Sequence, residues 1–393
     1  MLRPVQEALE GDYCMYGDNY FIDPKTIGPF IELPDGRLPM DPWEIRTFRK
    51  DGPGADFYTC GYYGLMRDCF DYFAERCITE IRRGDIDTFA RFLGSIAHVI
   101  EDSGTPAHAV GTNLGTDFKL IKLLHPCGDH EKMAAQFHPI LECRYEPFVL
   151  DYRPRLLGRT PEEISFRFLE RYTDMIEGAI GFVLPVMNAF YAGDDALVAR
   201  RLTQCGRFCS EVLADFIHSL FAVGAGRITP EELENLRMVS LGGLTPLERS
   251  AWMPNPYPYV EIRNAPWSRS QGGKQVPLML EIDGEETEYA DGFGLGPPFE
   301  ATYQLPEGVF ERFESAVGLN SRLPSVAGVV FEVWGDGVLI ASRSCQNVHE
   351  SGLMRCELHG VREIKLRISA TGDKPWPGHT HAVWGAARLF RPL

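Results

Sequence analysis

Hydrophobic residues recur at helical spacing through the first half of the chain. Behind the run Thr160-Pro-Glu-Glu, the apolar positions are three or four apart: Ile164, Phe168, Tyr172, Met175, Ile176 and Ala179. A threonine N-cap, a proline at the first helical position and acids in the first turn are typical of a helix start. Similar patterns cover residues 60–82, 85–102 and 194–221. We therefore predict an all-helical domain over residues 1–226.

The period of the pattern drops to two after residue 258. The run 362–369 alternates apolar and charged residues, which is typical of a half-buried strand. Two β-rich runs meet at Gly335-Asp336-Gly337, which predicts a hairpin. Many short strands of this kind predict an all-β sandwich, jelly-roll-like, over residues 258–393. Gly and Pro punctuate residues 227–257, which we interpret as a linker.

Composition and charge exclude some classes of function. The 393 residues are 44% hydrophobic, which is enough for two or three hydrophobic cores. The formal net charge of −16 repels phosphate backbones, so no tight binding of duplex nucleic acid is expected. No apolar run reaches the ~18–20 residues that span a bilayer. No signal peptide is visible at the start of the sequence.

The ten cysteines form no Cys-x-x-Cys pair. Cys205 and Cys209 are four residues apart, which suits one face of a helix. Cys345 and Cys356 flank an expected loop between strands, where a disulfide bond is one possibility. Free buried thiols are the alternative.

The helix predicted for residues 85–102 carries candidate chemistry. His98 and Asp102 are four residues apart, so they share a helix face and can converge on one ion. Gly104 and a proline two residues later end the helix, which lets His108 turn back toward the same place.

A second pair follows thirty residues later in the run FHPILE. Pro139 fits a first helical position, which puts His138 at the helix entrance and Glu142 one turn further on. Imidazole and carboxylate ligands without a nearby cysteine are typical of catalytic zinc. One such pair alone is more simply a polar surface contact, whereas two pairs are difficult to obtain by chance.

The spacing H-x3-D-x5-H at His98, Asp102 and His108, followed by H-x3-E at His138 and Glu142, resembles the zinc-dependent phospholipase C superfamily. That superfamily also contains the single-strand-specific zinc nucleases. The resemblance implies an all-helical fold with a metal cluster in a cleft. It further implies that His108, His138 and Glu142 bind one zinc ion, and that His98 and Asp102 bind a neighbouring one.

This resemblance covers about residues 8–225. The family supplies an earlier aspartate, which binds the second zinc and accepts a proton from the attacking water. Asp18 is the best match and Asp12 is the alternative. Thr47 stands where the family has a further histidine, and too few residues precede Asp18 to form the family's first helix. We therefore expect one or two zinc ions and no third site; a site that has decayed to a structural remnant is the alternative.

Residues 258–393 carry a second set of motifs. An early Trp267 is followed in order by the runs GFGLGPPFEATYQL, FESAVGLN, GVVFEVWGDGVLIASRS, VREIKLRIS and HTHAVWGAARL. They resemble the module called NPCBM, a carbohydrate-binding β-sandwich often attached to glycan-active enzymes. The family usually ends in an Asp-His-Ala-Asp-Trp-like run. Thr380-His381-Ala382-Val383-Trp384 stands here, so both acidic positions are lost.

Sugars bind to aromatic faces that have polar neighbours. Trp376, His379 and His381 lie close together in the sequence, and we take them as candidate carbohydrate-binding residues. Trp376 is the best candidate for stacking on a sugar because a loop position is expected for it. We interpret Trp267, Trp334 and Trp384 as core residues of the sandwich.

These patterns together predict metal-dependent hydrolysis of a phosphodiester, or of a related ester in a small lipid-like substrate, close to a glycan-bearing surface. The family resemblance implies a secreted or extracellular protein. A non-catalytic glycan-binding protein with a vestigial metal site is the main alternative. A single-strand nuclease is disfavoured by the net charge and by the lack of interleaved basic and aromatic residues.

Overall fold

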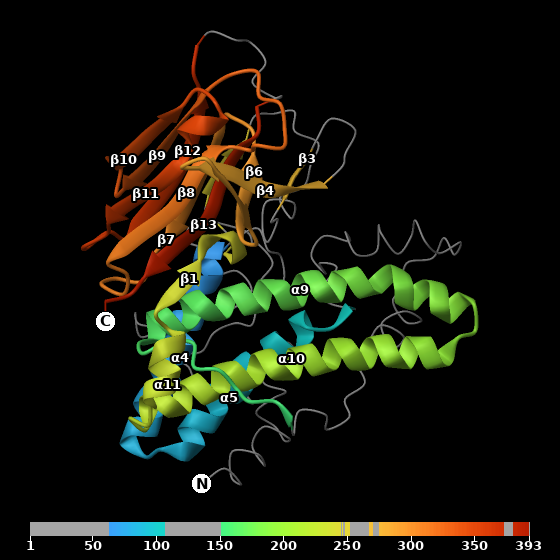
Figure 1. Ribbon diagram of the computed structural model, residues 1–393. Helices are drawn as coiled ribbons and strands as arrows, with labels where there is room; N and C mark the ends of the chain where they lie inside the picture. Colours follow the sequence, from blue (N-terminus) through green and yellow to red (C-terminus); the bar gives the residue numbers. More distant parts are fainter. Residues whose placement is uncertain are drawn as a thin grey trace, which may run out of the picture. The chain divides into compact units, whose positions relative to one another are not determined.

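The computed structural model describes residues 63–106, 151–244, 246, 248–251, 267–269, 275–372 and 380–392 (Figure 1). The chain forms two compact units, which meet in the sequence between Glu232 and Leu233. The first unit is helical and the second is built of strands. None of the helices among the described residues combines the length and the apolar character that a membrane span requires.

The described helices of the first unit are α4 (Tyr63–Arg83), α5 (Ile86–Ser103), α9 (Pro161–Tyr191), α10 (Asp195–Gly224) and α11 (Pro230–Asn235). The long helices α9 and α10 run antiparallel and are joined by a tight turn at Gly193 (Figure 1). Helix α4 packs against α9, α10 and α5. The helical segments predicted from periodicity are confirmed, and their described ends agree within one turn.

Helix α9 begins where the sequence predicted. The hydroxyl of the N-cap Thr160 accepts a hydrogen bond of 3.3 Å from the backbone N–H of Glu163, and Pro161 occupies the first helical position. The carboxylate of Glu163 accepts a bond of 2.9 Å from the N–H of Arg159. Every apolar position of the predicted stripe is buried: Ile164, Phe168, Tyr172, Met175, Ile176 and Ala179.

Aromatic rings form the centre of the helical core. The ring of Phe70 in α4 lies 4.7 Å from that of Phe168 and 5.2 Å from that of Tyr172, both in α9. Phe216 in α10 completes the group at 4.7 Å from Phe168. Edge-on and tilted pairs at these distances stabilise beyond simple burial, so three helices are held at one point.

The described residues of the second unit form three sheets. Its strands are β1 (Met238–Ser240), β2 (Glu248–Ala251), β3 (Trp267–Arg269), β4 (Gln275–Ile282), β5 (Glu285–Tyr289), β6 (Gly292–Leu295), β7 (Phe299–Gln304), β8 (Arg312–Leu319), β9 (Val329–Gly335), β10 (Val338–Cys345), β11 (Gly352–Glu357), β12 (Glu363–Ala370) and β13 (Ala382–Phe390). One sheet has the order β1-β13-β8-β11, with β6 also paired to β13, and the second has the order β10-β9-β12-β7-β2. The third sheet is β3-β4-β5.

The first two sheets pack face to face. The indole of Trp384, on β13, lies 5.1 Å from the ring of Phe331 on β9 of the other sheet and 6.1 Å from that of Phe313 on its own sheet. Ile364, Leu366 and Ile368 of β12 are all buried, as their alternation predicted. The predicted β-sandwich is therefore confirmed (Figure 1).

The hairpin between β9 and β10 is also confirmed. Asp336 and Gly337 have φ angles of 48° and 78°, and two consecutive positive values are typical of a type I′ turn. A difference concerns the expected linker at residues 227–257. There β1 pairs with β13 and β2 pairs with β7. These strands have three and four residues, too few for an alternating pattern to be visible.

Candidate functional site

Helix α5 carries two of the predicted metal-ligand positions. Positions 98 and 102 both lie in α5, one turn apart along the helix. The helical period puts positions 98 and 102 on one face of α5. The backbone of α5 therefore has the arrangement that a shared ion requires of these two positions.

The other candidate residues lie outside the described residues: Asp18, His108, His138, Glu142, Trp376 and His379. Within the ranges that the structure describes, no group of three or more His, Cys, Asp or Glu side chains is placed to hold a metal ion. The zinc site is thus neither confirmed nor contradicted, and it stays a prediction.

The end of α5 is held firmly at the point where the predicted ligand segment begins. The hydroxyl oxygens of Ser103 and Tyr172 lie 2.6 Å apart in the buried core. The thiol of Cys205 donates a hydrogen bond of 2.9 Å to the carbonyl of Gly104. A Cβ atom at position 104 would lie 2.5 Å from Sγ of Cys209, so only glycine fits against α10. The chain therefore leaves α5 from a defined position.

The segment of residues 151–160, which leads into α9, is fixed by a buried carboxylate. Asp215 of α10 is fully buried. Its Oδ1 accepts hydrogen bonds from the hydroxyl of Tyr152 at 2.8 Å and from the backbone N–H of Arg155 at 2.7 Å. Its Oδ2 lies 3.2 Å from Nε of Arg171. Burial and the bond to Asp215 raise the pKa of Tyr152 to about 12, so this phenol stays a donor.

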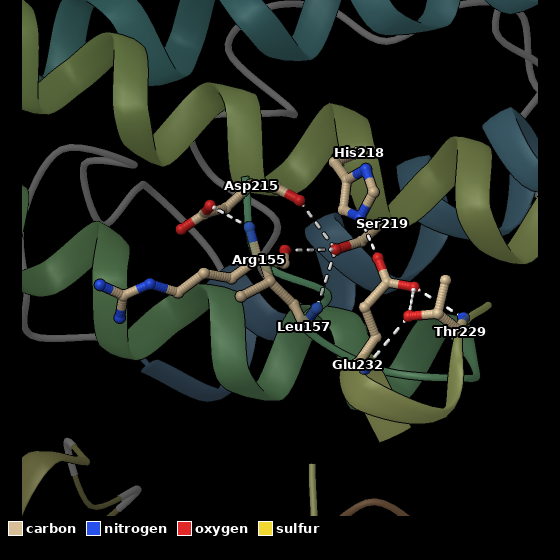
Figure 2. A network of polar contacts seen from close by, with 7 residues as sticks. All are labelled: Arg155, Leu157, Asp215, His218, Ser219, Thr229 and Glu232. Carbon is tan, nitrogen blue, oxygen red and sulfur yellow. Dashed lines mark hydrogen bonds and ion pairs between the residues drawn. The ribbon is translucent and has the colours of Figure 1, made fainter. Parts of the chain in front are cut away.

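Ser219, one turn further along α10, adds a second attachment (Figure 2). Its hydroxyl oxygen accepts a bond of 2.9 Å from the N–H of Leu157 and donates one of 2.7 Å to the carbonyl of Asp215. The described segments that end at residue 106 and begin at residue 151 are thus both fixed on the same helix, α10.

His218 is the one histidine of the helical unit whose side chain the structure describes. A ring nitrogen lies 2.6 Å from Oε1 of Glu232, while Oε2 accepts bonds of 2.7 and 2.8 Å from the N–H and hydroxyl of Thr229 (Figure 2). Burial acts to raise the pKa of Glu232, but the bonds from Thr229 and His218 outweigh it and lower that pKa. The side chain of His218 is 33% exposed, so it lies at the boundary of the helical core. The pair fastens α11 to α10.

Two aromatic residues of the sandwich differ in environment. Trp384 is fully buried, so its interpretation as a core residue is confirmed. The interpretation of Trp334 as a core residue is wrong. Trp334 is half-buried and alternates with the buried Phe331 and Val333, and its Nε1–H donates a bond of 3.3 Å to Oε2 of Glu332. The alternation itself could have shown this, since Trp334 is in phase with the charged Glu332.

His381 is the one candidate sugar-binding residue that the structure describes. The backbone N–H of His381 donates a hydrogen bond of 3.2 Å to Oγ of Ser325. Its backbone carbonyl accepts one of 2.8 Å from the backbone N–H of Asn320. The half-buried His381 thus directly precedes β13 with its backbone held on both sides. Its proposed contact with sugar is untested.

The possible disulfide between Cys345 and Cys356 is not present, because both thiols are free. The two residues lie on β10 and β11, which belong to different sheets. Cys345 instead donates a hydrogen bond to the carbonyl of Glu350 at 3.4 Å. Burial raises the pKa of Cys356 to about 12, so this residue is a neutral thiol at physiological pH. The alternative interpretation, free buried thiols, is correct for this pair.

Comparison with known proteins concerns the strand-rich unit. Residues 260–390 match the family described as NPCBM/NEW2 domain. No curated protein matches the chain. The C-terminal unit therefore contains an NPCBM-like module, as its motifs predicted.

Several solved structures are similar to the chain. The M60 catalytic domain with CBM51-1 and CBM51-2 domains of ZmpB from Clostridium perfringens is 25% identical at a TM-score of 0.32, over 39% of this chain and 15% of that one. A CBM51 module of Clostridium perfringens GH95, in complex with methyl-galactose, is 24% identical at a TM-score of 0.32. The match covers 39% of this chain and 99% of that one. The tandem CBM51 modules of a family 98 glycoside hydrolase from Streptococcus pneumoniae are 23% identical at a TM-score of 0.34. The match covers 42% of this chain and 50% of that one.

Proposed function

We propose that this chain binds glycans through its strand-rich unit and hydrolyses a phosphodiester or related ester with zinc in its helical unit. The match of residues 260–390 to the NPCBM/NEW2 domain family supports the glycan-binding half of this proposal. The C-terminal module would then keep the helical unit close to a glycan-bearing surface. Trp376, His379 and His381 are the residues proposed to contact the sugar.

The placement of His98 and Asp102 one turn apart on α5 is the observation that supports the hydrolytic half. Neutral imidazole and carboxylate are ligands that zinc prefers in catalytic sites. The proposed ligands are His98, Asp102, His108, His138, Glu142 and Asp18. Zinc in such a site lowers the pKa of water toward ~7 and polarises a phosphoryl oxygen.

The described residues have a positioning role in this proposal. Ser103 and Gly104 fix the end of α5 that leads to His108, while Asp215 and Ser219 fix the chain after Glu142. Ligands on segments with fixed ends lose less conformational freedom when they gather around an ion. Asp18 is proposed to accept the proton of the attacking water.

The test begins with zinc analysis of the purified full chain, where one or two ions per chain are expected. His108→Ala should lower the zinc content and abolish hydrolysis of a chromogenic phosphodiester. His359→Ala, at a histidine that is 73% exposed on the strand-rich unit, is the matched control and should change neither. A protein that is free of zinc after growth with zinc would contradict the proposal. A zinc-loaded but inert protein would indicate a non-catalytic glycan-binding protein.

Glycan binding is tested separately on a printed glycan array with the full chain. Binding that is lost in Trp376→Ala, with the thermal midpoint unchanged, would support the proposed sugar contact. Binding that Trp376→Ala leaves intact would contradict that contact, and a wild-type chain that binds no glycan would contradict the function. Cleavage of single-stranded DNA in preference to the chromogenic ester would favour the nuclease alternative.

A further inference from the structure

The outer face of the sheet β10-β9-β12-β7 has an ordered set of side chains around Trp334. Register places Leu339 of β10 and Lys365 of β12 directly opposite Trp334, one on each side. Glu332, two residues before Trp334 on β9, lies opposite Arg367 of β12 and forms the next row of the same face. Directly opposed residues of antiparallel strands point to the same side of the sheet, so the aromatic and charged groups share one face.

Ion pairs hold the charged row in place. Arg367 lies 3.0 Å from Glu300 on β7 and 3.3 Å from Glu332 on β9, so one guanidinium bridges three strands. The side chains of Arg367 and Glu300 are 43% and 37% exposed, which leaves donors and acceptors open to a ligand. Because Trp334 donates to the same Oε2 of Glu332, its indole is tied to this row.

An apolar strip lies beside the charged row. Leu339, opposite Trp334, is 44% exposed. Two large apolar side chains, Trp334 and Leu339, thus lie next to three ion-paired ones, on neighbouring strands about 4.8 Å apart. These side chains lie on the face of the sheet opposite the sandwich core, in which Phe331 of β9 packs against Trp384 of β13.

We propose that this outer face is a second binding surface for a neutral glycan chain, distinct from the candidate residues Trp376, His379 and His381. One sugar ring would lie on the indole of Trp334, and the hydroxyls of the next ring would bond to Glu332 and Arg367. The proposal rests on the proposed glycan-binding function, since the ligand class is the same.

Charge selects the ligand class. Around Trp334, the two carboxylates of Glu300 and Glu332 are balanced by Arg367 and Lys365, so these four groups give no excess charge that favours an ionic ligand. A neutral sugar matches this surface in two ways. Its apolar C–H face can lie on an indole, and its hydroxyls can donate to carboxylates and accept from a guanidinium.

The test measures retardation of the full chain in native gels that contain soluble neutral β-1,4-galactan, together with a printed array of neutral glycans. Trp334→Ala should weaken binding about tenfold, as expected for the loss of one stacked ring. Trp334→Phe, which keeps a ring but lacks the N–H, should retain most of the affinity. Leu353→Ala is the matched control, because Leu353 is an exposed apolar residue (52%) on β11 of the other sheet.

Each outcome decides the proposal. Weaker binding by Trp334→Ala, with an unchanged thermal midpoint and normal binding by Leu353→Ala, supports it. Normal binding by Trp334→Ala together with loss in Trp376→Ala overturns it and leaves the proposed function standing. A wild-type chain that binds no glycan overturns both. A change of oligomeric state in Trp334→Ala without a change in glycan binding overturns it and marks the face as an interface between copies.

Discussion

Oδ1 of the buried Asp215 lies 2.8 Å from the hydroxyl of Tyr152, a residue 63 positions earlier in the chain. The same oxygen accepts the backbone N–H of Arg155, and Oδ2 pairs with Arg171. One carboxylate therefore neutralises a guanidinium and satisfies two further donors. It also fixes the segment through which the chain re-enters the helical core.

Removing this carboxylate should destabilise the helical unit strongly. Asp215→Ala leaves three donors without their acceptor in a largely buried place, and breaking a buried pair costs about 3–5 kcal/mol. The measurement is unfolding in urea, monitored by the circular dichroism signal of the helices. Asp151→Ala is the control, because the side chains of Asp151 and its partner Arg207 are 72% and 44% exposed, and a solvent-exposed pair should contribute little to stability. Equal losses in the two variants would contradict this role for Asp215.

Gly104→Ala should destabilise the same unit through steric overlap. The new Cβ would lie 2.5 Å from Sγ and 2.7 Å from Cβ of Cys209, and overpacking of this kind costs about 1–3 kcal/mol. Gly181→Ala is the matched helical control, since its Cβ would meet nothing within 4 Å and alanine is the better helix former. The double variant Gly104→Ala, Cys209→Ala should recover part of the loss. A thermal midpoint of Gly104→Ala equal to the wild type's would refute the close contact.

Glu232 should make the stability of the helical unit sensitive to acid. Hydrogen bonds in the folded state hold the pKa of Glu232 below its ordinary value of 4.5, so the folded protein favours the ionised form. The resulting stability is present above pH 4.5 and is lost as the pH falls through the lowered value.

The measurement compares thermal midpoints of the wild type and Glu232→Gln between about pH 7 and about pH 3. The wild type should be the more stable above pH 4.5, and the difference should shrink below that value. Glu231→Gln is the control, as it is an exposed neighbour in the same helix. A difference between wild type and Glu232→Gln that stays constant with pH would rule out this linkage.

Cys345 and Cys356 should react as thiols without prior reduction. Both are buried, and burial raises the pKa of each, so the native protein should react slowly with a maleimide at neutral pH. In denaturant, without reductant, both peptides should carry the label when mapped by mass spectrometry. A disulfide-linked peptide pair that appears only before reduction would disprove the free state.

Local patterns were sufficient for the helices and for several strands. The stripe behind Thr160 predicted α9, and the alternation at 362–369 predicted β12, because burial of one face imposes a period on the sequence itself. The turn at Asp336-Gly337 was equally visible, since few residues tolerate two positive φ angles.

Contacts between distant residues were not visible in these patterns. The three- and four-residue strands β1 and β2 form because β13 and β7 offer free edges there, which no local period records. Cys345 and Cys356 are close enough in the sequence to suggest a disulfide, yet their strands belong to different sheets. Trp334 was interpreted as a core residue, although its phase in β9 places it with Glu332 on the outer face.

By itself the sequence determined the helical first half, the strand-rich second half, the NPCBM-like motifs and the one-turn spacing of His98 and Asp102. Each of these depends on residues that are near one another in the chain. Only the tertiary structure decided that Asp215 binds a segment some sixty residues earlier and that Arg367 bridges Glu300 and Glu332. Such pairings depend on which elements pack together, and packing is settled by the burial of whole faces, over distances that no local pattern spans.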